Sequence, residues 1–237
     1  MSLIESLISQ GWLKTPRIIE AFKKIKRADF LLSFAKATEG KPKELEKLAE
    51  LNKALPIGYG QTISQPLVVA FMLELLQPEV GDKILDIGSG SGWTSALLAH
   101  VVSRGELKSK IPALPAGRKN QKSKINGRVI AIEIIPELKE FGEKSVAKYN
   151  FIEKGIVQFV CADGSEGYEK EAPFNKILAS ASAEILPSAW KKQLKIEGRI
   201  VTPISSSIWL FIKKSETEFE EIEYPGFAFV PLITNRK

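Results

Sequence analysis

The chain has 237 residues, and 44% of them are hydrophobic, which is enough for one sizeable α/β domain with additions. No run reaches the ~18 apolar residues of a membrane span, and the first residues lack the basic-then-apolar pattern of a secretory signal. A single cysteine, Cys161, excludes an internal disulfide, and a single histidine, His100, argues against a histidine-based triad or metal site. We therefore expect a cytoplasmic protein that holds no metal and contacts no membrane.

The formal net charge of +6 is concentrated in one segment. Residues 104–126 contain one acidic residue, Glu106, against seven basic residues: Arg104, Lys108, Lys110, Arg118, Lys119, Lys122 and Lys124. The rest of the chain is therefore close to neutral, which argues against a broad nucleic-acid-binding face. We expect a monomer that does not have nucleic acid as a partner.

The N-terminal part is predicted to be helical. Residues 2–10 and 16–27 have the spacing of amphipathic helices, and a third helix is predicted within the charged stretch 36–53. We assign residues 1–60 to an N-terminal helical cap and residues 61–237 to the core that it covers.

Glycine, proline, hydroxyl and amide residues are concentrated in the segment LPIGYGQTISQP, residues 55–66. Local signals predict that Ser64 caps a buried helix over 65–76, with Pro66 near its start. The Ser64 hydroxyl is also a candidate functional group, and both interpretations stay open at this point.

A short apolar run, residues 83–87, is predicted to form a buried strand. After Asp86 the spacing is D-x-G-x-G-x-G, with Gly88, Gly90 and Gly92 leading into an Ala/Leu-rich helix. Alternating glycines expose backbone N–H groups and a helix N-terminus to a nucleotide-like ligand. The spacing resembles the S-adenosylmethionine loop of class I methyltransferases more than the dinucleotide fingerprint G-x-G-x-x-G.

The second strand is predicted over 128–132 and leads into Glu133. A ribose-binding acid is expected about 20 residues after the glycine turn, but Glu133 follows Gly92 by 41 residues. If the 23 residues of segment 104–126 are an insertion, the separation becomes 18. We therefore interpret 104–126 as a basic inserted loop and Glu133 as the ribose-binding acid.

Strands alternate with helices up to residue 203, which predicts an α/β fold with a doubly wound, mostly parallel sheet. Asp163 and Gly164 follow the third strand, predicted over 156–160, at a position where an acid can reach an adenine amino group. Beyond residue 180 the pattern predicts a helix over 183–195, a strand over 199–203, C-terminal antiparallel strands over 207–213 and 219–224, and a closing strand over 227–232.

Several segments together closely resemble protein-L-isoaspartate O-methyltransferases. They are LPIGYGQTISQP at 55–66, DIGSGSG at 86–92, VIAIEIIPEL at 129–138, ADGSEGY at 162–168 and FVPLI at 229–233. The resemblance covers nearly the whole chain except 36–50 and 104–126. It implies a seven-stranded Rossmann-like methyltransferase sheet and S-adenosylmethionine as cofactor. It also implies a protein repair reaction, in which the free α-carboxylate of an L-isoaspartyl residue in a damaged protein or peptide is methylated.

The resemblance also implies roles for individual residues. Ser64 takes the position of the active-site serine, with Thr62 beside it. The implied cofactor contacts are Ile63, Gly88, Glu133 at the ribose, Ile134, and Asp163 with Gly164 near the adenine. Because the acceptor carboxylate is already ionised at neutral pH, we expect Ser64 and Thr62 to orient it. Asp86 and the glycine turn are expected to hold the methionine end.

Two segments depart from the family pattern. Ser180, Ser182 and Glu184 occupy positions at which the family often has alanine. Many members also have a glycine-rich turn and a glutamine near residues 204–208, and this chain has neither there. These changes put substrate preference in question more than methyl transfer. Three alternatives stay open: a class I methyltransferase acting on RNA or a small molecule, a non-catalytic cofactor-binding relative, and a nicotinamide dehydrogenase.

Overall fold

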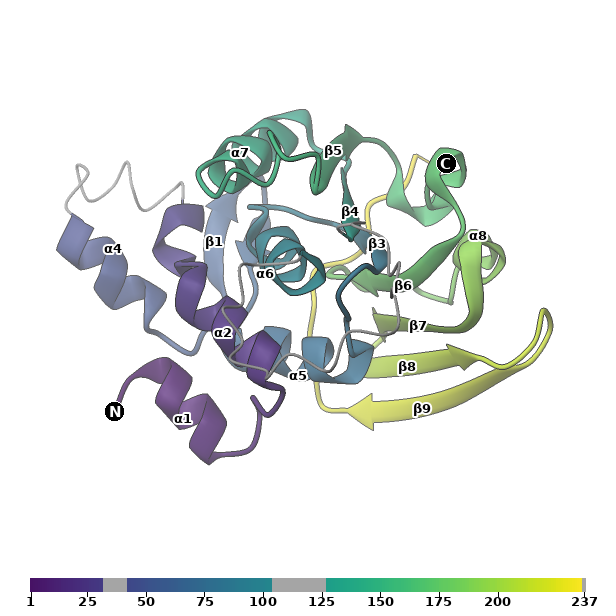
Figure 1. Cartoon of the computed structure of the whole chain (residues 1–237), viewed down its shortest axis with the longest axis horizontal. Coiled ribbons are helices and arrows are strands. Elements are labelled where there is room, and N and C mark those ends of the chain that lie inside the picture. Colours follow the sequence, from purple (N-terminus) through teal and green to yellow (C-terminus); the bar gives the residue numbers. More distant parts are fainter. Residues whose placement is uncertain (32–41, 104–126, 236–237) are drawn as a thin grey trace, which may run out of the picture.

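The structure is a computed structural model that describes residues 1–31, 42–103 and 127–235. Seven strands form its central sheet: β3 (Lys83–Ile87), β4 (Arg128–Glu133), β5 (Val157–Cys161), β6 (Phe174–Ala179), β7 (Leu194–Ile204), β8 (Ser207–Lys213) and β9 (Phe219–Pro225). The spatial order is β5-β4-β3-β6-β7-β8-β9, from top to bottom in Figure 1. Pairing is parallel from β5 to β7 and antiparallel for β8 and β9. The predicted fold class is confirmed, whereas the proposed insertion 104–126 lies outside the described residues.

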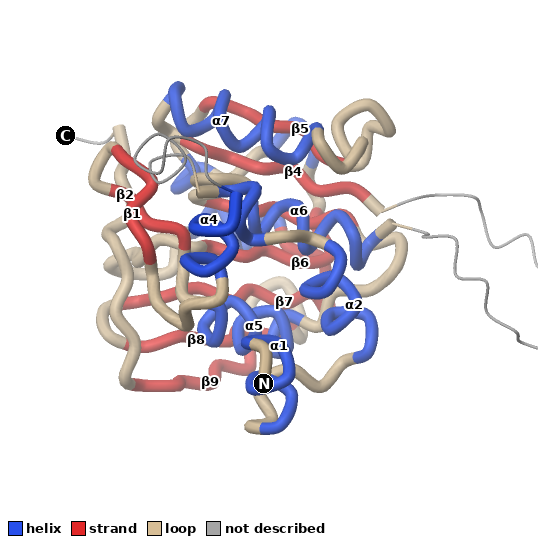
Figure 2. The backbone as a smooth tube through the Cα atoms, turned by 90° about the vertical axis from the view of Figure 1, so that its left-hand side faces the viewer, coloured by secondary structure: helices blue, strands red, loops and turns tan. Residues whose placement is uncertain are grey.

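Helices cover both faces of this sheet. One face carries α5 (Pro66–Leu76), α6 (Trp93–Val102) and α7 (Pro136–Ala147), and Figure 2 shows α5 and α6 in front of the strands. The other face carries α8 (Ser188–Gln193) and two short 3₁₀ turns, η2 (Gly164–Glu166) and η3 (Glu169–Glu171). Successive residues of β3, Ile84 and Leu85, belong to the two different apolar clusters. Burial on both faces explains why the central strands are apolar throughout.

The N-terminal helices pack on the first of these faces. They are α1 (Leu3–Ser9), α2 (Pro16–Lys24), η1 (Arg27–Phe30) and α4 (Pro42–Ala49). Ile18 and Phe22 of α2 belong to the same apolar cluster as the sheet residue Ile84, and the Phe22 ring meets the Trp93 ring edge-on at 5.6 Å. The N-terminal helices therefore share the main core with the sheet.

A small antiparallel hairpin precedes the central sheet. Its strands are β1 (Leu55–Gly58) and β2 (Gln61–Ile63), with Tyr59 at φ 55° and Gly60 at φ 71° in the turn. Figure 2 shows the hairpin and the C-terminus at the same end of the molecule. The hairpin leads directly into α5, with only Ser64 and Gln65 between the end of β2 and the start of the helix.

Two predicted elements near the C-terminus are wrong. The helix predicted over 183–195 is restricted to Ser188–Gln193, because Pro187 is its extended N-cap and Ala183 pairs with Ile204. The predicted closing strand over 227–232 does not join the sheet, whose edge is β9. Instead, Pro231 forms an isolated bridge with Ser182. None of the helices in the described ranges has both the length and the apolarity needed to cross a bilayer.

Candidate active site

A cleft lies at the carboxyl ends of β3 and β4, beside the point where the order of the parallel strands reverses. Ligands of open α/β sheets bind at such switch points. The space between its lining atoms is about 710 Å³ when the adjoining open solvent is included, and the enclosed part is only about 60 Å³. Of the predicted site residues, those lining the cleft are Thr62, Ile63 and Ser64 from the junction of β2 and α5, Gly88 and Gly90 from the glycine turn, and Glu133, Ile134 and Gly164 from the neighbouring strand ends.

The glycine turn connects β3 to α6, as its spacing predicts. Gly88, Gly90 and Gly92 have φ values of 70°, 51° and 84°, which side-chain-bearing residues rarely adopt. Gly92 does not line the cleft but packs against α7, where a Cβ atom would lie 2.9 Å from the Gly142 carbonyl oxygen. The glycines therefore set both the path of the turn and its close approach to the neighbouring helix.

The N–H groups of this turn are mostly engaged within the protein. Gly88 and Ser89 donate to the Ile132 carbonyl at 2.9 and 3.0 Å, and Gly92 donates to the Ser89 carbonyl at 2.8 Å. Gly90 donates to Glu133 Oε2 at 2.8 Å. The expectation that the turn offers free N–H groups is therefore wrong for these four residues. A phosphate cradle needs such groups, and these four residues do not supply them.

Glu133 ends β4 at the wall of the cleft and is only 5% exposed. Its Oε1 accepts the Ile135 N–H at 3.0 Å, and its Oε2 accepts the Gly90 N–H at 2.8 Å. Each carboxylate oxygen has a second lone pair, so both can still accept hydrogen bonds from a pair of ligand hydroxyls. Glu133 thus ties the glycine turn to the adjacent strand while keeping a negative charge at the cleft.

Asp86 lies behind the glycine turn instead of lining the cleft. It is fully buried, and its Oδ2 accepts the Ser95 hydroxyl at 2.5 Å. Its Oδ1 has no hydrogen-bond partner in the described part of the chain. Burial raises the pKa of Asp86 to about 7; the Ser95 hydrogen bond opposes this shift and the Glu133 charge adds to it. The protonation of Asp86 therefore depends on the charge of Glu133, although Asp86 itself does not line the cleft.

Asp163 is also set back from the cleft. Its Oδ1 accepts the Ser165 N–H at 2.9 Å, and its Oδ2 accepts the Asn235 N–H at 2.6 Å. It therefore joins η2 to the C-terminal segment, while the adjacent Gly164 lines the cleft. A Cβ atom at Gly164 would lie 2.4 Å from the Ile87 side chain, so no larger residue fits there without rearrangement.

The interpretation of Ser64 as a helix cap is wrong. The N-cap of α5 is Gln65, at φ −58° and ψ 130°, and Pro66 is the first helical residue. A residue before proline is disfavoured in the helical region, so α5 cannot begin one residue earlier. The Asn52 side chain, Oδ1, accepts the Leu67 N–H at 3.0 Å in place of a local cap. Ser64 is half-buried and lines the cleft.

Sequence reasoning missed several residues of the cleft. Trp93 and Ser89 line it, and the Ser89 hydroxyl has no partner among the described residues. Residues 230–233 form a further wall, held by two 2.8 Å hydrogen bonds between Ser182 and the backbone of Val230 and Leu232. The FVPLI resemblance marked this segment but not its location. Ser180 lines the cleft, while Ser182 and Glu184 line a neighbouring groove.

This arrangement defines the class of protein. A parallel sheet with a glycine turn at the switch point and an acid ending the next strand forms the S-adenosylmethionine site of a class I methyltransferase. The carboxyl groups of Glu133 and Asp86 favour a cationic ligand, and the Ser89 hydroxyl is open to hydrogen bonding. The four engaged N–H groups of the turn are not available to the pyrophosphate of a nicotinamide cofactor, which disfavours a dehydrogenase.

Comparisons with known proteins identify the family. The model of the protein-L-isoaspartate(D-aspartate) O-methyltransferase (PCMT) family matches residues 1–237, and the chain belongs to this family. A Methanopyrus kandleri relative named protein-L-isoaspartate O-methyltransferase is 35% identical over 98% of this chain and 89% of its own length. A Thermococcus onnurineus relative of the same name is 33% identical over 97% of this chain and 91% of its own length.

A crystal structure of a Plasmodium falciparum protein in complex with S-adenosyl-L-homocysteine shares the fold. It has a TM-score of 0.77 and 19% identity, and the match covers 98% of this chain and 97% of that chain. The family, the methyltransferase class and the S-adenosylmethionine cofactor predicted from the sequence are thus confirmed.

Proposed function

We propose that the cleft transfers a methyl group from S-adenosylmethionine to the free α-carboxylate of an L-isoaspartyl residue in a damaged protein or peptide. One observation carries this proposal: a single cleft is lined both by the glycine turn with Glu133 and by Thr62 with Ser64. The names of the relatives described above support the same activity. We further propose that the enzyme acts as a cytoplasmic monomer.

On the cofactor side, we assign three tasks to residues of this chain. The glycine turn and Ser89 hold the methionine end, Glu133 accepts the ribose hydroxyls, and Ile134 with Gly164 borders the adenine. Asp86 supports the positive charge of the cofactor from behind the turn, and Asp163 supports the adenine wall through Ser165. When bound, the cofactor supplies a methyl group on a positively charged sulfur, which becomes a neutral thioether when the methyl group leaves.

On the acceptor side, the task is alignment. A carboxylate with an ordinary pKa near ~4 is ionised at neutral pH, so no side chain has to remove a proton from it. Thr62 and Ser64 present hydroxyl groups to the cleft, and each can donate one hydrogen bond to a carboxylate oxygen. Holding an acceptor oxygen in line at about 3 Å from the reacting carbon can account for much of the rate.

Replacing Ser64 with alanine is expected to lower kcat for an isoaspartyl peptide by about tenfold, the worth of one orienting hydrogen bond to a charged group. Cofactor affinity should stay within about twofold, because the substitution leaves the glycine turn and Glu133 intact. The measurement is transfer of a labelled methyl group to the isoaspartyl peptide, with its aspartyl twin as control. Full turnover by Ser64→Ala would contradict the role of Ser64, and cofactor binding without any turnover of the wild type would indicate a non-catalytic relative.

Deleting residues 104–126 tests the alternative of an RNA substrate, because most of the net positive charge lies there. The flanks permit this change, since the Gly127 N–H donates to the Val102 carbonyl at 3.0 Å and a short glycine-serine link can join them. The flanks meet β4 at Arg128, whereas the cleft is at its other end, Glu133. We expect kcat and KM for the isoaspartyl peptide to stay within about twofold. Loss of peptide methylation, with RNA methylation by the intact chain, would favour the RNA alternative.

A further inference from the structure

The turn that carries Ser64 leads into α5 without a local side-chain cap. Pro66, the first residue of α5, has no N–H, and the N-cap Gln65 makes no side-chain cap bond. Two side chains from the preceding part of the chain, Arg27 and Asn52, bind this turn instead. Neither of them lines the cleft.

Asn52 holds the part of this turn that follows Ser64, at the first turn of α5. Its Oδ1 accepts the Leu67 N–H at 3.0 Å, one of the first-turn donors of α5 that has no acceptor within the helix. This contact spans 15 residues of sequence, and Asn52 is half-buried. Asn52 therefore sets where α5 begins relative to the loop that precedes the β1–β2 hairpin.

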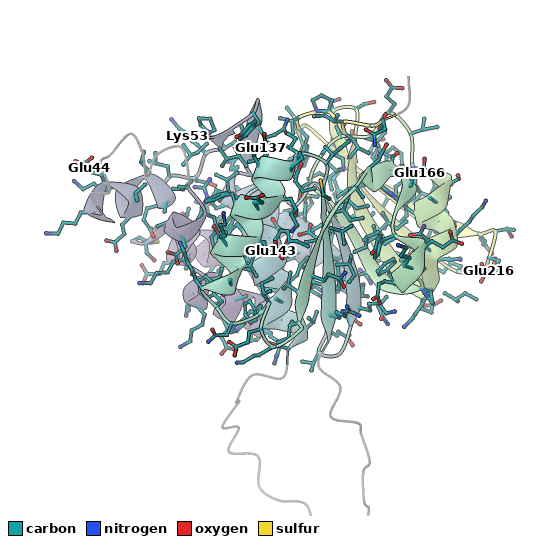
Figure 3. All side chains as sticks on the ribbon, turned by 90° about the horizontal axis from the view of Figure 1, so that it is seen from above. Glu44, Lys53, Glu137, Glu143, Glu166 and Glu216 are labelled. Atoms are coloured by element: carbon teal, nitrogen blue, oxygen red, sulfur yellow. The ribbon has the colours of Figure 1, made fainter. Side chains whose placement is uncertain are left out.

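Arg27 holds the backbone of Ser64 itself. Its Nη2 donates to the Ser64 carbonyl at 3.1 Å and to the Lys53 carbonyl at 2.7 Å. Its Nη1 donates to the Leu51 carbonyl at 2.9 Å and, at 3.3 Å, to that of Ala49. The guanidinium therefore binds the Ser64 peptide and both residues that flank Asn52. Figure 3 shows Lys53 close to the hairpin.

The same guanidinium also reaches the cofactor side of the cleft. Arg27 is 6% exposed, and its Cζ lies 5.4 Å from the centre of the Trp93 ring, which lines the cleft next to the glycine turn. The planar guanidinium has several N–H donors in a fixed arrangement and can hold several carbonyl oxygens at once. The single ammonium group of a lysine cannot reproduce this arrangement. Arg27 thus connects the Ser64 backbone to the first residue of α6.

We propose that Arg27 and Asn52 are positioning residues, which set the distance and angle between the Ser64 hydroxyl and the methyl donor. The inference rests on the proposed role of Ser64. It predicts that substitutions of Arg27 or Asn52 lower kcat and leave cofactor affinity nearly unchanged. Small displacements of an aligned reacting group can lower the rate by up to ~100-fold.

The first test compares two substitutions of one residue. Asn52→Ala removes the acceptor for the Leu67 N–H, and we expect it to lower kcat for the isoaspartyl peptide about tenfold with cofactor affinity within about twofold. Asn52→Asp retains an acceptor, and a carboxylate is favoured at a helix N-terminus, so its kcat should return to within about threefold of the wild type. Steady-state kinetics, calorimetry with the cofactor and a thermal midpoint are measured for each variant. An Asn52→Ala enzyme with wild-type kinetics, or an Asn52→Asp enzyme as slow as Asn52→Ala, would overturn the inference.

Arg27→Lys has a matched control in Arg17→Lys. Arg17 also donates to two backbone carbonyls, those of Val101 and Ser103, but at the end of α6 remote from the cleft. Both substitutions are expected to lower the thermal midpoint. Only Arg27→Lys should lower kcat, by about tenfold or more. Equal kcat values for the two variants would overturn the proposed role of Arg27.

A double substitution separates this inference from the proposed function. If Asn52 acts through the Ser64 hydroxyl, Ser64→Ala combined with Asn52→Ala should be no slower than the slower single variant, because coupled residues are not additive. If the kcat losses of the two single variants multiply in the double variant, the inference is overturned and the role of Ser64 stays intact. A Ser64→Ala enzyme with full activity would instead overturn the role of Ser64 itself.

Discussion

Replacing Glu133 with alanine should weaken S-adenosylmethionine binding by about 100-fold or more. Two hydrogen bonds from ribose hydroxyls to a charged acceptor would be lost, each contributing about 1.5 kcal/mol or more. The substitution also removes the acceptor of the Gly90 and Ile135 N–H groups, at 2.8 and 3.0 Å, so the glycine turn loses its tie to β4. Calorimetry with the cofactor measures the change directly.

Glu133→Gln should bind nearly as weakly as Glu133→Ala. One edge of an amide is a donor, and it would face a backbone N–H that is itself a donor. Glu137→Ala is the matched control, because Glu137 is an exposed acid at the start of α7, as Figure 3 shows, and does not line the cleft. Unaltered cofactor affinity in Glu133→Ala would refute the ribose assignment.

The second large effect concerns Asp86 and pH. Its folded-state pKa of about 7 lies above the value near ~3.9 expected in the unfolded chain. The folded protein therefore keeps a proton that the unfolded chain releases between pH ~4 and pH ~7. Stability from this group is fully present at low pH and is lost as the pH rises through that window, by up to about 4 kcal/mol. Denaturant unfolding at about pH 5 and about pH 8 should show about 3 kcal/mol of this loss in the wild type and none of it in Asp86→Asn.

Cofactor binding should change with pH in the opposite direction. A positively charged sulfur near the glycine turn favours the ionised form of Asp86, so binding near neutral pH should release part of a proton. Affinity is then expected to rise with pH between about pH 6 and pH 8 in the wild type and to be flat in Asp86→Asn. Calorimetry in two buffers with different ionisation enthalpies measures the number of protons released when the cofactor binds. Identical heats in both buffers would show that Asp86 does not respond to the ligand.

The parts of this site that were predictable are those in which function depends on neighbours in sequence. The glycine spacing after Asp86 predicted a turn between a strand and a helix, and Glu133 was located once the basic segment was treated as an insertion. Both inferences follow from the geometry of a strand, a tight turn and a helix. The parallel sheet followed from the alternation of strand and helix patterns.

The parts that were not predictable depend on contacts between distant residues. The hydroxyl of Ser64 favoured a helix that begins at Gln65. Pro66 disfavours a helical conformation at Gln65, and the helix begins at Pro66 instead. The acceptor that replaces Ser64 is Asn52, which no local pattern links to α5. The set-back position of Asp86 and its raised pKa depend on burial, which spacing alone does not reveal. Residues 227–232 had strand-like alternation, but their partner is Ser182 and not the sheet edge.

The wall formed by residues 230–233 has a consequence for biosynthesis. During translation, every strand of the central sheet leaves the ribosome before these residues do, since β9 ends at Pro225. A nascent polypeptide can thus begin to assemble its sheet while the pocket is still unfinished. Stabilisation by a ligand requires the binding-competent form, so the methyl donor can assist folding only after residues 230–233 have been synthesised.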